Sequence, residues 1–291
     1  MANRLSIRKT HKLFIGGRFP RGESGRYLTV MNPLSPGDST LVCRASRKDL
    51  REAIGAARSA LKAWSGASAY LRGQILYRAA EMLESRANSI ADEALAAAGA
   101  KPKDARKEVA AAIDRLVYYA GWTDKLSQVF GSVNPVGSPH FNFTVPEPTG
   151  VMVIFSPAEP SLLACVDLIA ATLAAGSTCV VIVPASTGLG AAPLGEVFAT
   201  SDVPAGAVNL LTADPGELAP WAAGHMDVNG IIDAANHPPL AATLAAGPSS
   251  NLKRVHRIQR SAKAWWQDGC KNPSSVLAAL EPKTAWHPVG V

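Results

Sequence analysis

The sequence is poor in cysteine and in aromatic residues. Its 291 residues include four cysteines, and Phe, Trp and Tyr together make up 6%. The cysteines are Cys43, Cys165, Cys179 and Cys270, so none has the short spacing that a disulfide scaffold or a zinc module requires. We therefore expect reduced thiols and a cytoplasmic location. Charged residues make up 18% and hydrophobic residues 47%, a balance that argues against a disordered chain.

Long apolar runs are missing as well. The most apolar stretch, residues 162–175, contains Asp167 and is too short to cross a bilayer. Residues 1–10 carry three basic side chains, but no apolar stretch follows them, so we expect no signal peptide. These absences predict a protein that works without a membrane.

An excess of acidic residues is also absent, because 29 Lys and Arg face 23 Asp and Glu, for a formal charge of +6. The densest group of bases is Lys253, Arg254, Arg257, Arg260 and Lys263, followed by Trp265 and Trp266. Bases beside aromatic rings can bind single-stranded nucleic acid. The alternative is the solvated edge of a strand or helix. We favour this alternative because two adjacent aromatics without a repeated platform are more typical of a core or subunit interface. No nucleic-acid partner is expected.

The first half of the sequence has helical periodicity. Residues 13–17 predict a strand that runs into a turn, with Tyr27–Met31 as its partner. Apolar residues at helical spacing then predict a helix that begins after the N-cap Ser46, a second over residues 70–98 and a third over residues 103–126.

In the second half, short apolar strands alternate with helices. The expected strands cover residues 150–155, 178–183, 207–211 and 228–232. The expected helices cover residues 161–175, 191–200, 215–224 and 240–246. This alternation predicts an α/β fold with N-terminal helices packed on a doubly wound, Rossmann-like parallel sheet. Such sheets often bind nucleotides at the carboxyl ends of their strands.

The common catalytic motifs are missing. Gly188-Leu189-Gly190 follows a strand, but Pro193 stands where a dinucleotide-binding loop would have its third glycine. There is no P-loop, no zinc-protease motif and no nucleophile elbow, and the six histidines lack metal-ligand spacing. Cys270 has no identifiable base beside it, so we interpret it as an inert thiol. We expect no catalytic residue and no metal.

Over residues 12–255 the chain resembles the N-terminal part of an aldehyde dehydrogenase. The matching segments, in order, are residues 14–17, 56–64, 78–84, 118–125, 147–151, 173–178, 203–209 and 251–255. They include Phe-Ile-Gly-Gly at the start, Tyr-Tyr-Ala-Gly-Trp-Thr-Asp-Lys and Glu-Pro-Thr-Gly-Val. The resemblance implies a cofactor-binding domain, a catalytic domain and an oligomerisation arm.

The departures from the family pattern fall on its functional positions. Ala158 stands where the family has the Asn of its oxyanion hole, and Ile258 where it has the general-base Glu. Val183 and Ser186 replace the Lys and Glu that hold the adenosine ribose, and Asp233 lies in the segment beside the pyrophosphate. We therefore expect no NAD(P) binding. The alternative is an oxidoreductase with altered, weak NAD or NADP binding that uses Cys270 or a borrowed nucleophile.

The resemblance places the nucleophilic cysteine and the catalytic domain beyond residue 258, where this chain has only a short remainder. We expect the catalytic domain to be missing, with a junction at Lys271-Asn272-Pro273. Residues 1–130 and 149–270 are assigned to a degenerate cofactor-binding domain, and residues 131–148 and 274–291 to an oligomerisation arm. The expected interface residues are Phe141, Phe143, Val145, Thr284 and Trp286.

This combination resembles the silent second half of two-part aldehyde dehydrogenases. It suggests a non-catalytic structural or regulatory subunit that pairs with a full-length aldehyde dehydrogenase subunit or with itself. The C-terminal strand is expected to join a neighbour's sheet.

Overall fold

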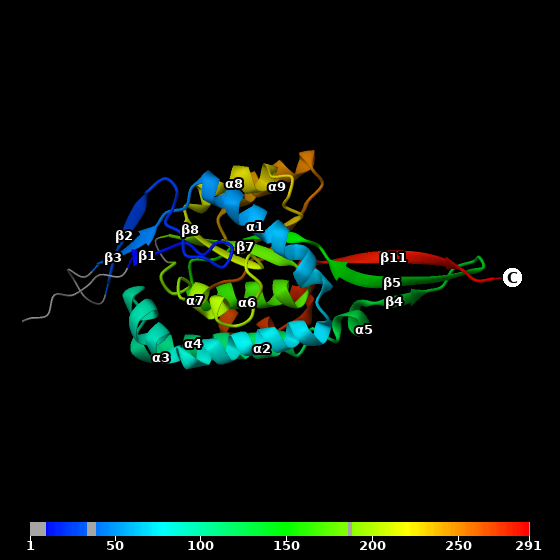
Figure 1. Ribbon diagram of the computed structural model, residues 1–291, viewed down its shortest axis with the longest axis horizontal. Coiled ribbons are helices and arrows are strands. Elements are labelled where there is room, and N and C mark those ends of the chain that lie inside the picture. Colours follow the sequence, from blue (N-terminus) through cyan, green and yellow to red (C-terminus); the bar gives the residue numbers. More distant parts are fainter. Residues whose placement is uncertain (1–9, 34–38, 186–187, 291) are drawn as a thin grey trace, which may run out of the picture.

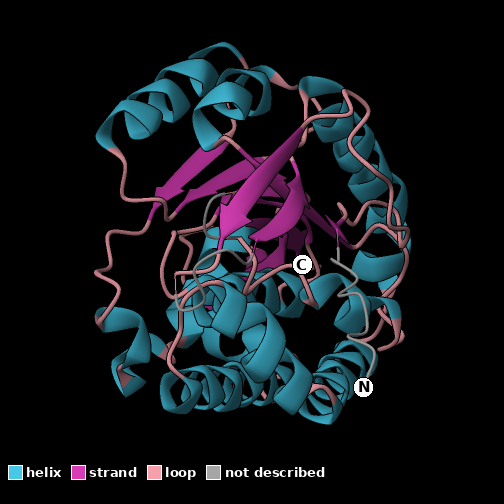
Figure 2. Cartoon of the chain, turned by 90° about the vertical axis from the view of Figure 1, so that its left-hand side faces the viewer, coloured by secondary structure: helices cyan, strands magenta, loops and turns pink. Residues whose placement is uncertain are grey.

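A five-stranded, fully parallel sheet forms the centre of the fold (Figure 2), in the order β10-β9-β6-β7-β8. The computed structural model describes residues 10–33, 39–185 and 188–290. The strands are β6 (Val151–Phe155), β7 (Thr178–Pro184), β8 (Val208–Ala213), β9 (Gly230–Asp233) and β10 (Arg254–Arg257). The apolar runs of β6 and β7, rich in β-branched residues, suit strands covered on both faces. The expected doubly wound α/β fold is confirmed.

Helices cover both faces of this sheet (Figure 1). One face packs against α6 (Ser161–Ala174), which is buried along its whole length, and α2 and α4 lie outside α6. The other face packs against α1 (Arg47–Gly66), α8 (Pro215–Gly224) and α9 (Pro238–Ala246). A short helix, α7 (Leu194–Ala199), connects β7 to β8. Among the described residues, no helix combines the length and hydropathy needed to span a membrane.

The helix predicted over residues 70–98 is interrupted. It consists of α2 (Ala69–Ser85), α3 (Ala87–Ser89) and a π-helical turn over Ile90–Leu95. The break lies at Arg86. The Ser85 and Arg86 side chains both donate to the Met82 carbonyl, which would otherwise accept the Arg86 N–H. The Arg86 N–H donates to the Leu83 carbonyl, one residue nearer than in a regular α-helix. The next helix, α4 (Pro102–Ala120), ends six residues before the predicted position, and α5 (Leu126–Phe130) follows a turn.

The N-terminal strands pair differently from the prediction. β2 (Tyr27–Met31) pairs with β3 (Ser39–Cys43), and β3 also pairs with β1 (Thr10–His11). The expected partner at residues 13–17 lies elsewhere, because Phe14 exchanges backbone hydrogen bonds with Leu210 of β8. The N-terminal segment is thereby attached to the edge of the central sheet.

A three-stranded antiparallel arm projects from the body (Figure 1). It contains β4 (Ser132–Asn134), β5 (His140–Pro148) and β11 (Leu280–Pro288), in the order β11-β5-β4. The C-terminal strand β11 pairs with β5 of its own chain over nine residues, and the expectation that it joins a neighbour's sheet stays a prediction for its outer edge. The Ala279 carbonyl accepts the Thr149 N–H at 2.9 Å, which places the start of β11 beside the end of β5.

The segment between β10 and β11 packs on the body. Trp265 and Val276 are buried in the same core cluster as α6. Residues 273–279 form a short 3₁₀ helix that contacts α6, so the arm begins at Leu280 and not at residue 274. The burial of Val276, Ala278 and Ala279 explains this shifted boundary.

Candidate functional site

The candidate cofactor edge lies where the carboxyl ends of the parallel strands meet. The chain order of the strands reverses between β6 and β9, which is the position where open α/β sheets bind their ligands. Ala158 follows β6, Asp233 ends β9 and Val183 lies near the end of β7. The structure therefore places these three predicted positions at one edge. Ser186 lies outside the described residues.

Asp233 is held within the fold at this edge. Its side chain is 2% exposed, and Oδ1 accepts the Ala235 N–H at 3.2 Å. Its Oδ2 lies 3.9 Å from Nε of Arg257 on the neighbouring strand. A phosphate brought to this position would meet a carboxylate in place of donors.

The other family positions present hydrocarbon. Val183 is buried in the core beneath the sheet edge, and Ala158 offers only an exposed methyl group. Ile258 is half-buried against the core, and its N–H donates to the Asp233 carbonyl at 2.8 Å. None of these three side chains can donate a hydrogen bond or accept a proton.

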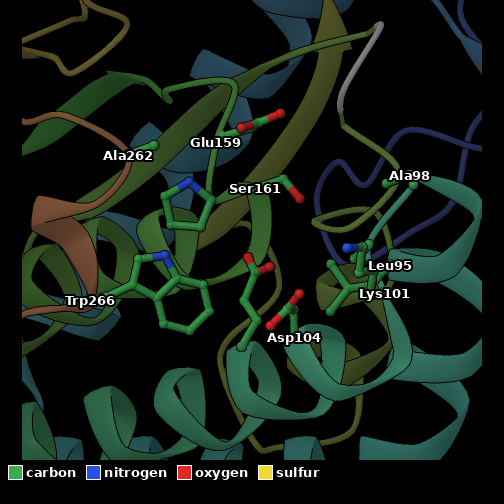
Figure 3. A pocket seen from close by; sticks show the side chains of 12 residues that line it. Leu95, Ala98, Lys101, Asp104, Glu159, Ser161, Ala262 and Trp266 are labelled. Atoms are coloured by element: carbon green, nitrogen blue, oxygen red, sulfur yellow. The ribbon is translucent and has the colours of Figure 1, made fainter.

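A cavity of about 360 Å³ opens beside Ala158, between α4, the N-terminus of α6 and the C-terminal segment (Figure 3). Its lining includes Leu95, Lys101, Asp104, Glu108, Glu159, Ser161 and Trp266. No histidine or cysteine is among the described residues that line it. Its charged groups are one lysine and three carboxylates.

Glu108 is the cavity residue that sequence reasoning missed. It lies on the buried face of α4, and its Oε1 accepts the N–H groups of Leu162 and Leu163 at 2.8 and 3.1 Å. Burial raises the pKa of Glu108, and the nearby Glu159 adds to this, while the two N–H bonds oppose it. Glu108 therefore caps the N-terminus of α6 from another helix. The sequence offers one signal for Glu108: it is an acidic residue on the same helical stripe as the apolar Ala105 and Val109.

A buried ion cluster attaches the C-terminal segment to the body. Asp167 of α6 lies 3.5 Å from Arg115 Nη1 and 3.7 Å from Arg260 Nη1. Arg115 also donates to the Trp265 carbonyl at 3.0 Å, and the Arg260 guanidinium lies 4.8 Å from the Trp265 ring centroid. Burial raises the pKa of Asp167 to about 6, against the effect of both arginines.

The basic residues between 253 and 263, which were predicted to lie on a solvated edge, contact different parts of the fold. Lys253 is 8% exposed and donates to the Ala223 carbonyl at 2.8 Å, so the expectation of a solvated lysine there is wrong. Arg254 donates to Thr149 at 2.8 Å and to the Leu280 carbonyl at 3.2 Å.

Cys270, the thiol interpreted as inert, is also enclosed. It is buried, and its Sγ donates to the Ala264 carbonyl at 2.7 Å. Within the described part of the chain, no three or more His, Cys, Asp or Glu side chains lie together in a way that could hold a metal ion.

The predicted interface residues lie on two faces of the arm. Successive strand residues point to opposite faces, so Phe141, Phe143 and Val145 share one face. Thr284 pairs with Thr144, and Trp286 pairs with Asn142, which places both on the opposite face. The Phe141 and Phe143 rings lie 5.5 Å apart on the first face.

Both faces and one edge of the arm are open. Val133 is 68% exposed, Phe141 47% and Trp286 59%. The outer edge of β11 pairs with no other strand in the part of the chain that the structure describes. A sheet of three strands with uncovered apolar side chains and a free edge is suited to pairing with another chain.

Comparison with known proteins matches the aldehyde dehydrogenase family over residues 19–257. Cytosolic 10-formyltetrahydrofolate dehydrogenase of Pongo abelii is 34% identical over 240 residues, which cover 79% of this chain and 26% of that protein. An aldehyde dehydrogenase of Aspergillus niger is 29% identical over 282 residues, which cover 96% of this chain and 54% of that protein.

Among solved structures, the NAD⁺ complex of an aldehyde dehydrogenase from Bacillus cereus is similar, with a TM-score of 0.78 and 25% identity over 86% of this chain and 50% of that one. The chain thus spans about a quarter of the first relative and about half of the other two. The family match covers most of the chain and coincides with the parallel sheet and its helices. The chain belongs to the aldehyde dehydrogenase family.

Proposed function

We propose that this chain is a non-catalytic structural or regulatory subunit, which pairs through its arm with a full-length aldehyde dehydrogenase subunit or with a second copy of itself. The observation that carries the proposal is the projecting three-stranded sheet. It combines exposed Phe141 and Trp286 side chains with the unpaired edge of β11. Unpaired main-chain groups and apolar side chains favour the addition of a strand from another chain.

The non-catalytic part of the proposal is supported by the sheet edge. Ala158, Val183 and Ile258 present hydrocarbon, and Asp233 presents a carboxylate, at positions where the family pattern has donors or a base. We infer that the chain binds neither NAD nor NADP at cellular concentrations and carries out no aldehyde oxidation by itself. A cytoplasmic location, without nucleic-acid or membrane partners, belongs to the same proposal.

The experiment is a measurement of molar mass by light scattering on the wild-type chain and on Trp286→Ala and Phe141→Asp. We expect the wild type to be a dimer or larger, or to capture a full-length aldehyde dehydrogenase from its native cell. Each variant should shift the protein towards monomer or release that partner. Tyr70→Ala is the matched control, because it removes an exposed ring from the body, at 71% exposure, and should leave the mass unchanged. A wild-type monomer that binds no aldehyde dehydrogenase would contradict the proposal.

A further inference from the structure

A second cavity, of about 310 Å³, lies between the first turn of α1 and the C-terminal half of α8. These two helices lie side by side (Figure 1). The cavity is lined by Arg47, Lys48, Leu50, Arg51, Trp221 and His225. Every ionisable group among these described residues is a base. The cavity therefore has the opposite electrostatic character to the one beside Ala158.

The two arginines of this cavity are not neutralised by neighbouring acids. Neither Arg47 nor Arg51 makes an ion pair or hydrogen bond with a described residue, whereas Lys48 pairs with Glu23. The other nearby acids are already engaged. Asp49 is buried and accepts the Ser46 and Glu23 N–H groups, and Asp227 lies 3.7 Å from Arg58. Two free guanidinium groups at one concave site attract an anion.

His225 adds a third donor. Its Nδ1 accepts the Asp227 N–H at 3.2 Å, so the neutral ring carries its proton on Nε2. Burial lowers the pKa of His225, and the charges of Lys253 and Arg51 lower it further, while Asp227 opposes them. A bound anion would add a negative charge beside the ring and raise its pKa.

Trp221 supplies the apolar wall. Its side chain is 48% exposed, and the Arg47 guanidinium lies 4.5 Å from its ring centroid. A guanidinium stacked on an indole is held in place without a salt bridge. The indole surface and a volume near 310 Å³ suit a small molecule with a flat ring.

We propose that this cavity binds a phosphate monoester whose organic part is a flat, apolar ring. The phosphate has three acceptor oxygens and about two negative charges, which match the donors of Arg47, Arg51 and His225. The ring packs against Trp221. This site is separate from the arm and does not depend on the assembly proposed above.

The test is a titration of the full chain with phenyl phosphate, followed by calorimetry and by the proton resonances of His225, which the variant His225→Gln identifies. Inorganic phosphate and benzyl alcohol are titrated in parallel at constant ionic strength. We expect phenyl phosphate to bind more tightly than either and to raise the pKa of His225. Arg47→Ala and Arg51→Ala should each weaken binding about tenfold, as expected for a lost charged hydrogen bond.

Two further variants separate the site from general charge attraction. Trp221→Ala should weaken phenyl phosphate more than inorganic phosphate, because inorganic phosphate loses only the support that the indole gives to Arg47. Arg78→Ala is the control, because it removes an exposed arginine of α2 and should change neither. The proposal is overturned if phenyl phosphate fails to bind at millimolar concentration, if it binds no better than inorganic phosphate, or if the arginine variants bind as the wild type does.

Discussion

At the scale of single residues, burial determines what the carboxylates of this protein do. Asp167 and Glu108 are both enclosed between α4 and α6, and burial raises the pKa of each. Asp233 is equally enclosed, and a backbone N–H and Arg257 satisfy it. All three therefore serve the fold and are not available as exposed acids or bases. Two experiments follow at this scale.

The first concerns the pH dependence of stability. The pKa of Asp167 is about 6 in the folded chain, above its ordinary value of 3.8. The folded state therefore binds more protons than the unfolded state between about pH 4 and pH 6, and the free energy of unfolding falls as pH rises through this window. The contribution lost is up to about 3 kcal/mol. Urea denaturation of Asp167→Asn should show a flatter profile than the wild type. The exposed control Asp124→Asn should keep the wild-type slope, and an unchanged slope in Asp167→Asn would refute the assignment.

The second concerns the cofactor. Calorimetric titration of the wild-type chain with NAD and with NADP should show no binding at physiological concentrations, because the edge offers Val183 and Asp233 where donors are needed. Cys270→Ala should leave any activity of an assembled complex unchanged, since that thiol is buried and donates to a carbonyl. A dissociation constant in the micromolar range would favour the oxidoreductase alternative.

At the scale of elements, the sequence predicts those strands and helices whose own residues carry an apolar pattern. Strands β6 to β9 were predictable because each contains a short apolar run and a helical segment separates it from the next strand. β10 was not, since only one of its four residues, Val255, is apolar, and the segment becomes a strand by pairing with β9. The break at Arg86 depends on two side chains that donate to the Met82 carbonyl. The spacing of apolar residues along the sequence does not reveal such hydrogen bonds.

The candidate site divides in the same way. The family positions Ala158, Val183 and Asp233 could be located from sequence, because the resemblance aligns them one by one. Glu108 could not, since its partners at Leu162 and Leu163 are more than fifty residues away and meet it only when α4 packs on α6. Residues that act through tertiary contacts lie beyond what one sequence reveals.

Glu108 provides the prediction at this scale. Glu108→Ala removes the acceptor for two buried N–H groups at the start of α6 and should lower the free energy of unfolding by about 2 kcal/mol. Glu108→Gln keeps a carbonyl oxygen at that position and should cost less. Chemical denaturation measures both, with the exposed Glu84→Ala as the control. Equal losses in the Ala and Gln variants would argue against the capping role.

At the scale of the whole molecule, one segment joins the body to the arm. After β10 the chain crosses α4 and α6, buries Trp265 and Val276, and then enters β11. The arm is therefore attached at both ends: β5 leads directly into β6, and β11 follows the buried segment. Stability of the body and association through the arm should consequently depend on different aromatic residues.

Two tryptophans of this C-terminal region separate these properties. Trp265 is 1% exposed, and its carbonyl accepts from Arg115. Trp265→Ala should cost about 3–5 kcal/mol of unfolding free energy, the usual loss for a large buried aromatic. Trp286 contacts the His140 ring edge-on and is largely exposed, so Trp286→Ala should change stability little. Its effect should instead be on assembly, where a central aromatic often contributes ~2 kcal/mol or more. Thermal unfolding at a dilution where the wild type is monomeric, together with molar mass at high concentration, measures the two effects separately. If Trp286→Ala lowers monomer stability as much as Trp265→Ala does, Trp286 is part of the folded core and the arm has no separate role in association.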